Sequence, residues 1–313
     1  MKVLWASVVL VAMLVVGCAG TPEAIPMVKT EIVSPDKVEE YRKAAEQGEA
    51  KAQDILGFCY ANGIGVTKDE TEAVKWYRKA AEQGDLRAQY ILGGCYAFGI
   101  GAAKDETEAV KWYRKAAEQG EAKAQRILGF YYAFGIGVAK DETEAVKWWH
   151  KVAEQGEAKV QRILGDCYAS GTGVTRDETE AVKWYRKAAE QGEAKAQGIL
   201  GDYYASGTGV AKDETEAAKW WHKAAEQGEA YSQYNIGNCY QKGIGVAKHP
   251  AEAVKWYRKA AEQGNAYAEY NLGDCYASGT GVAKDETAAV KWFRKAADQG
   301  DTRAKMELSK LGK

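Results

Sequence analysis

The cysteines and histidines are the side chains best suited to nucleophilic, metal-binding or acid–base chemistry, and the chain holds few of them. Three histidines, His150, His222 and His249, occur without an HExxH, CxxC or serine–histidine–aspartate pattern. Apart from Cys18, the cysteines stand at one recurring place in the sequence: Cys59, Cys95, Cys167, Cys239 and Cys275. Ligands strung along a chain at a fixed interval do not converge on one metal ion. The sequence therefore predicts no catalytic residue, no metal site and no cofactor.

Cys18 follows an apolar leader and is positioned for lipidation. Lys2 precedes the apolar run from Val3 to Val16, which is shorter than the roughly 20 residues of a transmembrane helix and fits a secretory signal. The leader ends in Val-Val-Gly-Cys, which looks like a lipobox. This resemblance implies cleavage after residues 1–17 and acylation of Cys18, and more than one acyl chain makes an anchor stable. The alternative is a plain secretory signal followed by an incidental cysteine.

The residues after Cys18 indicate where the protein would lie. Ala19 and Gly20 follow Cys18, and the absence of aspartate there implies, by the lipoprotein rule, the outer membrane of a bacterial cell envelope, on its periplasmic or surface face. Three prolines fall between Thr21 and Pro35, so residues 18–33 are predicted to form a lipidated, flexible tether.

An ungapped repeat of 36 residues organises the rest of the chain. The sequence Glu-Gln-Gly recurs with its glycine at 48, 84, 120, 156, 192, 228 and 264, and Asp-Gln-Gly ends at 300. Such arrays grow in one dimension, without a single central core. The solenoid is predicted over residues 34–313, as a half unit 34–48, seven full units (49–84, 85–120, 121–156, 157–192, 193–228, 229–264 and 265–300) and a half unit 301–313.

Each unit is predicted to form a pair of helices, here named helix A and helix B. In the first unit the apolar stripe of helix A comprises Ala52, Ile55, Leu56, Cys59 and Tyr60. A glycine inside this helix, Gly57, is expected to let a neighbouring helix approach closely, and Gly63 and Gly65 turn the chain. Asp69 is predicted to cap helix B, with Glu72 reaching back to it. With the half units, this predicts an all-α fold of about 16 helices.

The residue pattern of the repeat resembles that of the Sel1-like family. Unit 85–120 carries its pattern at Ala88, Gln89, Leu92, Gly93, Tyr96, Gly99, Gly101, Asp105, Ala109, Trp112, Tyr113, Lys115, Ala116, Ala117, Gln119 and Gly120. The resemblance implies a right-handed α-solenoid of antiparallel helix pairs, close to tetratricopeptide repeats. It also implies a scaffold or adaptor that mediates protein–protein interactions in the bacterial envelope or with a host, and it names no partner.

The five recurring cysteines are predicted to be buried thiols. Equivalent helices in stacked units lie about 10 Å apart, which exceeds the roughly 7 Å between Cα atoms that a disulfide permits. A cysteine-rich subset of the family has two cysteines per unit that staple the helix pair, whereas this chain has one per unit. Tyr131 and Tyr203 occupy the same place in the remaining two units.

Specific binding can reside only at places that differ among the repeats. Two neighbouring helix A places vary most and fall on the flank expected to face the concave surface. We predict a groove there with a basic middle and an aromatic C-terminal end, formed by Tyr90, Lys123, Arg126, Lys159, Arg162, Tyr231, Tyr234, Tyr267 and Tyr270. Tyrosine and arginine are favoured interface residues. The alternative is neutral divergence among recent duplicates.

Composition narrows the class of partner. The 43 basic and 44 acidic residues nearly cancel, which argues against nucleic acid. The favoured function is a membrane-anchored scaffold that binds proteins in the envelope or in a host, without a small-molecule cofactor. Two alternatives remain open: a scaffold for binding or exporting an envelope polysaccharide, and a hydrolase acting on β-lactams or peptidoglycan, as the cysteine-rich subset implies.

Overall fold

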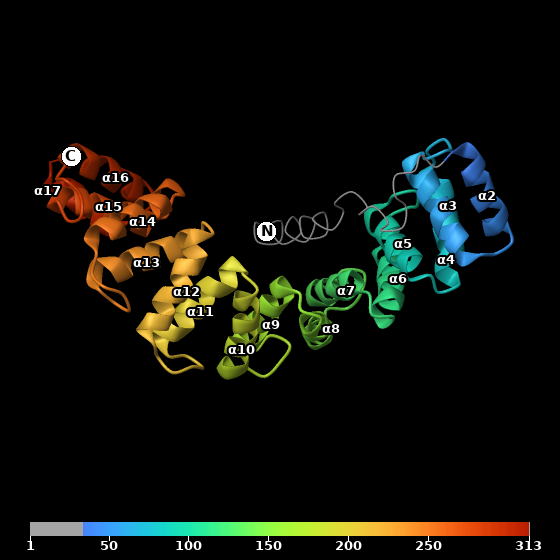
Figure 1. Cartoon of the computed structure of the whole chain (residues 1–313), viewed down its shortest axis with the longest axis horizontal. Coiled ribbons are helices and arrows are strands. Elements are labelled where there is room, and N and C mark those ends of the chain that lie inside the picture. Colours follow the sequence, from blue (N-terminus) through green and yellow to red (C-terminus); the bar gives the residue numbers. More distant parts are fainter. Residues whose placement is uncertain (1–33, 313) are drawn as a thin grey trace. The chain divides into compact units, whose positions relative to one another are not determined.

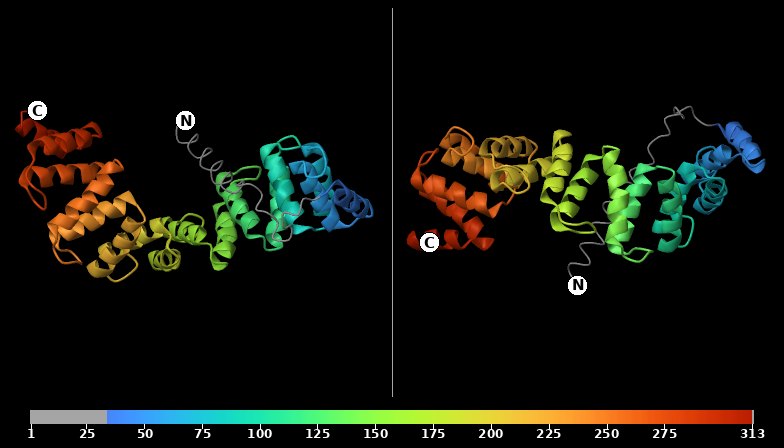
Figure 2. Two further views of the ribbon diagram at one scale, coloured as in Figure 1. Left: turned by 45° about the horizontal axis from the view of Figure 1, so that its top comes forward. Right: turned by 90° about the horizontal axis from the view of Figure 1, so that it is seen from below.

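The computed structural model describes residues 34–312, and every regular element within them is an α-helix. The signal peptide 1–17, Cys18 and the tether 18–33 lie outside the described residues. The chain forms two compact units, one ending at Gln155 and the other starting at Gly156. Within each unit, consecutive helices pack side by side (Figure 1). Figure 2 shows this neighbour-to-neighbour packing from two further directions, most clearly among the orange and red helices of the second unit.

The predicted count of sixteen helices is confirmed for residues 34–312. The first unit contains α2 (Pro35–Glu46), α3 (Ala50–Asn62), α4 (Glu70–Glu82), α5 (Leu86–Phe98), α6 (Glu106–Glu118), α7 (Ala122–Phe134) and α8 (Glu142–Glu154). The second unit contains α9 (Ala158–Ser170), α10 (Glu178–Glu190), α11 (Ala194–Ser206), α12 (Glu214–Glu226), α13 (Ala230–Lys242), α14 (Pro250–Glu262), α15 (Ala266–Ser278), α16 (Glu286–Asp298) and α17 (Thr302–Lys310). From α3 onward, odd-numbered helices are helix A and even-numbered helices are helix B.

The helix ends follow the predicted signals, with one correction. Gly63 ends α3 in the left-handed region with φ of 68°, and the Oδ1 atom of Asp69 accepts a hydrogen bond from the backbone N–H of Glu72 at 2.9 Å. The predicted reach-back of Glu72 is wrong. Its carboxylate instead accepts from Lys75 Nζ at 2.8 Å, and the backbone N–H of Asp69 donates to the carbonyl of Tyr60 at 2.9 Å. The backbone N–H of the capping residue Asp69 therefore donates to the preceding helix, α3, and not to Glu72.

The glycine inside each helix A permits the close packing that the sequence predicts. It faces the aromatic ring of the paired helix B, and a Cβ atom built on it would lie between 2.3 and 2.8 Å from that ring in all seven full repeats. At Gly57 the ring belongs to Tyr77, and at Gly129 it belongs to Trp149. Because real Cβ atoms do not approach this closely, glycine sets the separation of the two helices.

Within each unit, a glutamine pair connects neighbouring repeats. Gln89 Nε2 donates to the carbonyl of Ala81 in the preceding helix B at 3.1 Å, and Gln119 Nε2 donates to Gln89 Oε1 at 2.7 Å. The side chain of Gln89 is 4% exposed, so both bonds satisfy a polar group that packing removes from water. The last full repeat carries Glu269 at this place, and Gln299 donates to its carboxylate at 2.7 Å.

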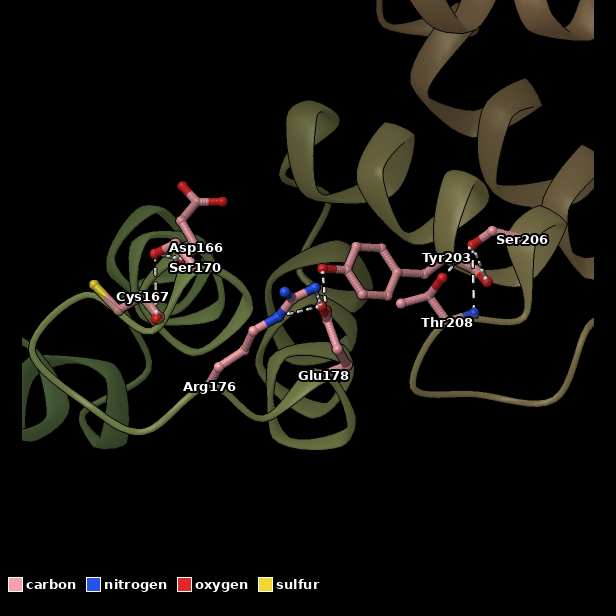
Figure 3. A network of polar contacts seen from close by, with 8 residues as sticks. All are labelled: Asp166, Cys167, Ser170, Arg176, Glu178, Tyr203, Ser206 and Thr208. Carbon is pink, nitrogen blue, oxygen red and sulfur yellow. Dashed lines mark hydrogen bonds and ion pairs between the residues drawn. The ribbon is translucent and has the colours of Figure 1, made fainter.

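The loop after helix A also packs on the preceding repeat. A Cβ atom at Gly101 would lie 2.0 Å from the carbonyl oxygen of Glu70 in α4, and Gly101 adopts φ of 66°. In the second unit, Tyr203 occupies a cysteine place, and its hydroxyl donates to Glu178 of α10 at 2.9 Å (Figure 3). The cysteine place therefore lies at the contact between repeats. None of the helices described in residues 34–312 is both long and apolar enough to span a bilayer.

Candidate functional site

The predicted binding residues all lie on helix A, but they divide between the two units. Tyr90 on α5 and Lys123 and Arg126 on α7 belong to the first unit, whereas the other six belong to the second. Tyr90 is half-buried, with its ring centroid 5.9 Å from that of Tyr113, and Lys123 is exposed. The basic middle of the predicted groove therefore comprises one pair in each unit, Lys123 with Arg126 and Lys159 with Arg162.

In the second unit three of the four predicted tyrosines, Tyr231, Tyr234 and Tyr267, form an aromatic cluster. The ring centroid of Tyr234 lies 6.5 Å from that of Tyr231 on the same helix and 5.8 Å from that of Tyr267 on α15. Tyr270 packs on Phe293 at 5.7 Å. Tyr231 and Tyr267 remain 47% and 56% exposed, so the outer rings of the cluster are open to a partner.

The C-terminal half unit adds two residues that the sequence analysis did not single out. Arg303 on α17 places its guanidinium carbon 4.1 Å from the centroid of Tyr270 and 5.7 Å from that of Tyr267. Met306, at the place of Tyr270 in the register, is 61% exposed. We name Tyr231, Tyr234, Tyr267, Tyr270, Arg303 and Met306 the tyrosine surface. Extending the alignment of repeats into residues 301–313 would have found both additions.

Arg162 is less available than its predicted role in a basic groove requires. Its guanidinium donates to Asp166 Oδ2 at 2.6 Å, and its Nε atom lies 3.8 Å from Glu193. The side chain is 22% exposed. Asp166 and Glu193 balance its positive charge within the second unit, whereas Lys159 on the same helix is exposed. Variation at the place of Arg162 alone does not reveal this contact, because it depends on a second place one helical turn away.

A column of polar residues runs beside the tyrosines in the second unit. It comprises Asp166, Asp202, Asn238 and Asp274, one turn after the varying place. The hydroxyl of Tyr257 donates to Asn238 Oδ1 at 2.8 Å, and Asn271 Nδ2 donates to the same atom at 3.1 Å. Burial raises the pKa of Asp202 to about 6, although the hydrogen bond from Trp221 opposes this. In the first unit the same column carries Phe58, Gly94 and Phe130.

In the first unit, the varying place on helix A carries a buried carboxylate that pairs with an arginine of the next repeat. Asp54 is fully buried and accepts two hydrogen bonds from Arg87 Nη1, at 2.7 and 2.6 Å. Burial raises the pKa of Asp54, and the adjacent Arg87 guanidinium opposes the rise. This pair connects neighbouring repeats, so a place that varies among repeats can also serve packing.

The five recurring cysteines are all buried, as predicted, and are free thiols in residues 34–312. Burial raises the pKa of Cys95, Cys239 and Cys275 to about 11. Such thiols are almost wholly protonated at neutral pH, and the thiol form is a poor nucleophile and metal ligand. Across residues 34–312, no group of three or more histidine, cysteine, aspartate or glutamate side chains is arranged to hold a metal ion.

Comparison with known proteins agrees with this architecture. A structure of a protective antigen from uropathogenic Escherichia coli, with an SLR fold, has a TM-score of 0.77 and 42% identity, covering 88% of this chain and 59% of the antigen. This chain thus spans less than two thirds of that relative. A Sel1 repeat protein from Oxalobacter formigenes has a TM-score of 0.68 and 37% identity, covering 88% of this chain and 80% of that protein. Among curated proteins, the search found no match.

The family model for the Sel1 repeat matches the chain eight times. The matches cover residues 41–49, 50–85, 86–121, 122–157, 158–193, 194–229, 230–265 and 266–301. They follow the 36-residue register without a gap, one residue later than the units defined from the glycines. The chain therefore belongs to the Sel1 repeat family.

Proposed function

We propose that the chain is a membrane-anchored scaffold of the bacterial cell envelope that binds a protein partner through the tyrosine surface. The observation that carries this proposal is the exposure of Tyr231 and Tyr267 above a packed base of Tyr234 and Tyr270. Rigid aromatic side chains with one open face supply large contact area at a low cost in conformational entropy. The four tyrosines and Arg303 come from three helices whose spacing the repeat fixes.

The proposed location depends on residues outside 34–312. The apolar leader and Cys18 support export and lipid attachment, with the tether 18–33 separating the solenoid from the outer membrane. The similarity to a protective antigen of uropathogenic Escherichia coli agrees with an exported protein. A host protein or another envelope protein is the class of partner proposed.

We further propose that the chain is not an enzyme and takes no cofactor. The raised thiol pKa values leave Cys95, Cys239 and Cys275 protonated at neutral pH. His150 and His222 lie beside Glu154 and Glu226 on helix B. A nitrocefin hydrolysis assay tests the β-lactamase alternative, and turnover above the rate of a heat-denatured sample would refute this proposal.

Crosslinking in living cells followed by mass spectrometry would identify the partner, and one pair of variants then tests the surface. Tyr231→Ala with Tyr267→Ala removes the two exposed rings while keeping the half-buried base intact. We expect the affinity for the crosslinked partner to fall by about tenfold or more, since hot-spot tyrosines each contribute over about 1 kcal/mol. The matched control is Phe98→Ala with Phe134→Ala, which removes rings that are 40% and 46% exposed in the first unit. Equal affinity of both pairs would contradict the proposed surface.

The same variants distinguish the polysaccharide alternative. If crosslinking recovers no protein and the tyrosine variants instead lose retention on an affinity column of envelope polysaccharide, the partner is a glycan. We favour a protein because the tyrosine surface includes Arg303 and Met306, and aromatic residues, arginine and methionine are enriched in protein interfaces.

A further inference from the structure

One repeat of the second unit shows how an arginine side chain binds on helix A. In repeat 157–192, Asp166 accepts hydrogen bonds on both carboxylate oxygens. Tyr185 donates its hydroxyl to Oδ1 at 2.8 Å, and Arg162 donates from its guanidinium to Oδ2 at 2.6 Å. Glu193, the N-cap of the next helix A, lies 3.8 Å from Arg162 Nε. Figure 3 shows the Asp166 carboxylate extending away from Ser170 and Cys167.

The following repeat keeps the acceptors of this arginine but replaces the arginine itself with glycine. Asp202 stands at the place of Asp166, and its Oδ1 atom accepts from Trp221 Nε1 at 3.0 Å, as Asp166 accepts from Tyr185. Glu229 stands at the place of Glu193. The place of Arg162 is Gly198, so Asp202 Oδ2 accepts no hydrogen bond from the part of the chain that the structure describes.

Because Gly198 has no side chain, the aromatic ring of Trp221 on the paired helix B is less buried than its equivalents. In the six other full repeats, the aromatic residue of helix B that faces this place is buried, with 1–6% exposure. Trp221 is only half-buried. The register that puts Tyr267 against Tyr234 places Tyr231 beside Gly198, and Tyr231 is 47% exposed. Two aromatic residues and two carboxylates therefore lie around Gly198, which is itself buried.

A buried hydroxyl provides an independent sign that a polar group belongs at this position. Ser232 replaces the alanine or valine of the other full repeats and is fully buried, yet its Oγ atom has no hydrogen-bond partner among the described residues. It points at Gly198, because a Cβ atom built there would lie 2.8 Å from Ser232 Oγ and 3.6 Å from Glu229 Oε2. Buried hydroxyl groups without partners are rare, and each asks for an explanation.

We propose that the position over Gly198 on α11 binds the guanidinium group of an arginine side chain from a partner protein. Asp202 Oδ2 and Glu229 accept its N–H groups, Ser232 Oγ accepts a further one, and the Trp221 indole supplies a face for cation–π stacking. The burial that raises the pKa of Asp202 to about 6 fits a carboxylate whose counter-cation comes from outside. This inference rests on the proposed scaffold function and specifies the chemistry of its partner.

A titration with blocked arginine tests the site without any knowledge of the partner. The probe is Nα-acetyl-arginine amide, added to the ¹⁵N-tryptophan-labelled chain, and the signal is the indole N–H resonance of Trp221, assigned by its loss in Trp221→Phe. One charge-assisted contact with stacking corresponds to a Kd of about 1–10 mM. We expect the Trp221 resonance to move with this affinity, and Nα-acetyl-citrulline amide, the neutral isostere, to bind at least about tenfold more weakly.

Two variants keep the test independent of folding defects. Gly198→Arg with Ser232→Ala restores the residues found 36 positions earlier, Arg162 and Ala196. The new arginine side chain should then fill the site and abolish the shift. Asp202→Asn keeps an oxygen acceptor for Trp221, which Asn238 provides for Tyr257 elsewhere, and should weaken arginine binding by about fivefold or more. Circular dichroism confirms that both variants fold.

The outcomes separate this proposal from its alternatives. Equal shifts with arginine and citrulline, or no Trp221 shift with either, overturn the guanidinium site. Free L-arginine binding more than about tenfold tighter than the blocked form would indicate a metabolite site and would overturn the assignment to a partner protein. The Trp221 titration needs no partner, whereas the tyrosine variants are scored by affinity for the crosslinked partner, so failure of one proposal is distinguishable from failure of the other.

Discussion

Two adjacent glycines on α5 should respond to the same substitution in opposite directions. Both are helical, and alanine at either position gains about 1 kcal/mol of helix propensity. A Cβ atom at Gly94 would meet only Tyr113 Oη, at 3.6 Å, which is ordinary van der Waals contact. A Cβ atom at Gly93 would lie 2.7, 2.8 and 3.0 Å from Cδ1, Cε1 and Cγ of the same ring. Gly94→Ala should therefore stabilise the fold, and Gly93→Ala should destabilise it.

The magnitude follows from the confinement of Tyr113. Its side chain is 2% exposed, and its ring centroid lies 5.9 Å from that of Tyr90 and 5.8 Å from that of Tyr131. The ring has little room to move, so overpacking at Gly93 should cost about 1–3 kcal/mol before the propensity gain is subtracted. Because that gain is common to both variants, this cost is also the expected difference between their unfolding free energies.

Urea denaturation followed by circular dichroism measures the difference as a shift in midpoint. Stability of equal sign in the two variants would refute the close-packing explanation of the repeated glycine. A double-mutant cycle adds a second check. In a Tyr113→Leu background the ring is gone, so Gly93→Ala should lose most of its cost, and a cost that persists would have to arise from some contact other than this ring.

Three further predictions concern the last repeat, the cysteines and the anchor. Glu269→Gln should stabilise the fold by about 1 kcal/mol at neutral pH, since glutamine can both accept from Gln299 and donate to Ala261, as Gln233 does to Ala225. Burial raises the pKa of Glu269, so the folded state binds its proton more tightly, and stability falls as pH rises through that pKa. The advantage of glutamine should thus be small below pH about 4 and full at pH 7 in thermal melts, and a pH-independent difference would contradict the cause. Under denaturing, non-reducing conditions, Ellman's reagent should detect five thiols per mature chain; two or fewer would mean that disulfides form. Cys18→Ser should move the protein from the membrane fraction to the soluble fraction and abolish labelling with radioactive palmitate, whereas unchanged membrane association would favour a different means of attachment.

Because the sequence repeats, the helices, their caps and their packing could be predicted in more detail than a single copy allows. Seven copies averaged out the ambiguity that a single helix leaves, so the helix count, the caps at Asp69 and its equivalents, and the role of Gly57 were all predictable. The error at Glu72 has a local cause, because a glutamate at this place can reach either backward to the cap or forward to Lys75. Periodicity does not decide between these two contacts.

The candidate site was predictable only in part, since it depends on pairs of places rather than on single ones. Comparing the copies singled out Tyr234 and Tyr270, which pack on Tyr257 and Phe293 of the paired helix B. It also placed Arg162 in a basic groove, although Asp166 one turn later pairs with that residue. Gly198 was visible as a difference between repeats, but its effect on Trp221 and Ser232 required coordinates, because those residues lie on other helices.

The contacts between repeats have a consequence for how such a protein can evolve. Neighbouring repeats contact one another in a common pattern. It consists of the hydrogen bonds of Gln89 and Gln119 and the close packing of Gly101 on Glu70. A gene that loses or duplicates one whole repeat by recombination therefore encodes a chain whose new junction already has compatible partners on both sides. The number of repeats can therefore change in a single recombination event, and the change is inherited. What such an event alters is the order of the side chains displayed on helix A, and with it the spacing between Gly198 and the tyrosines.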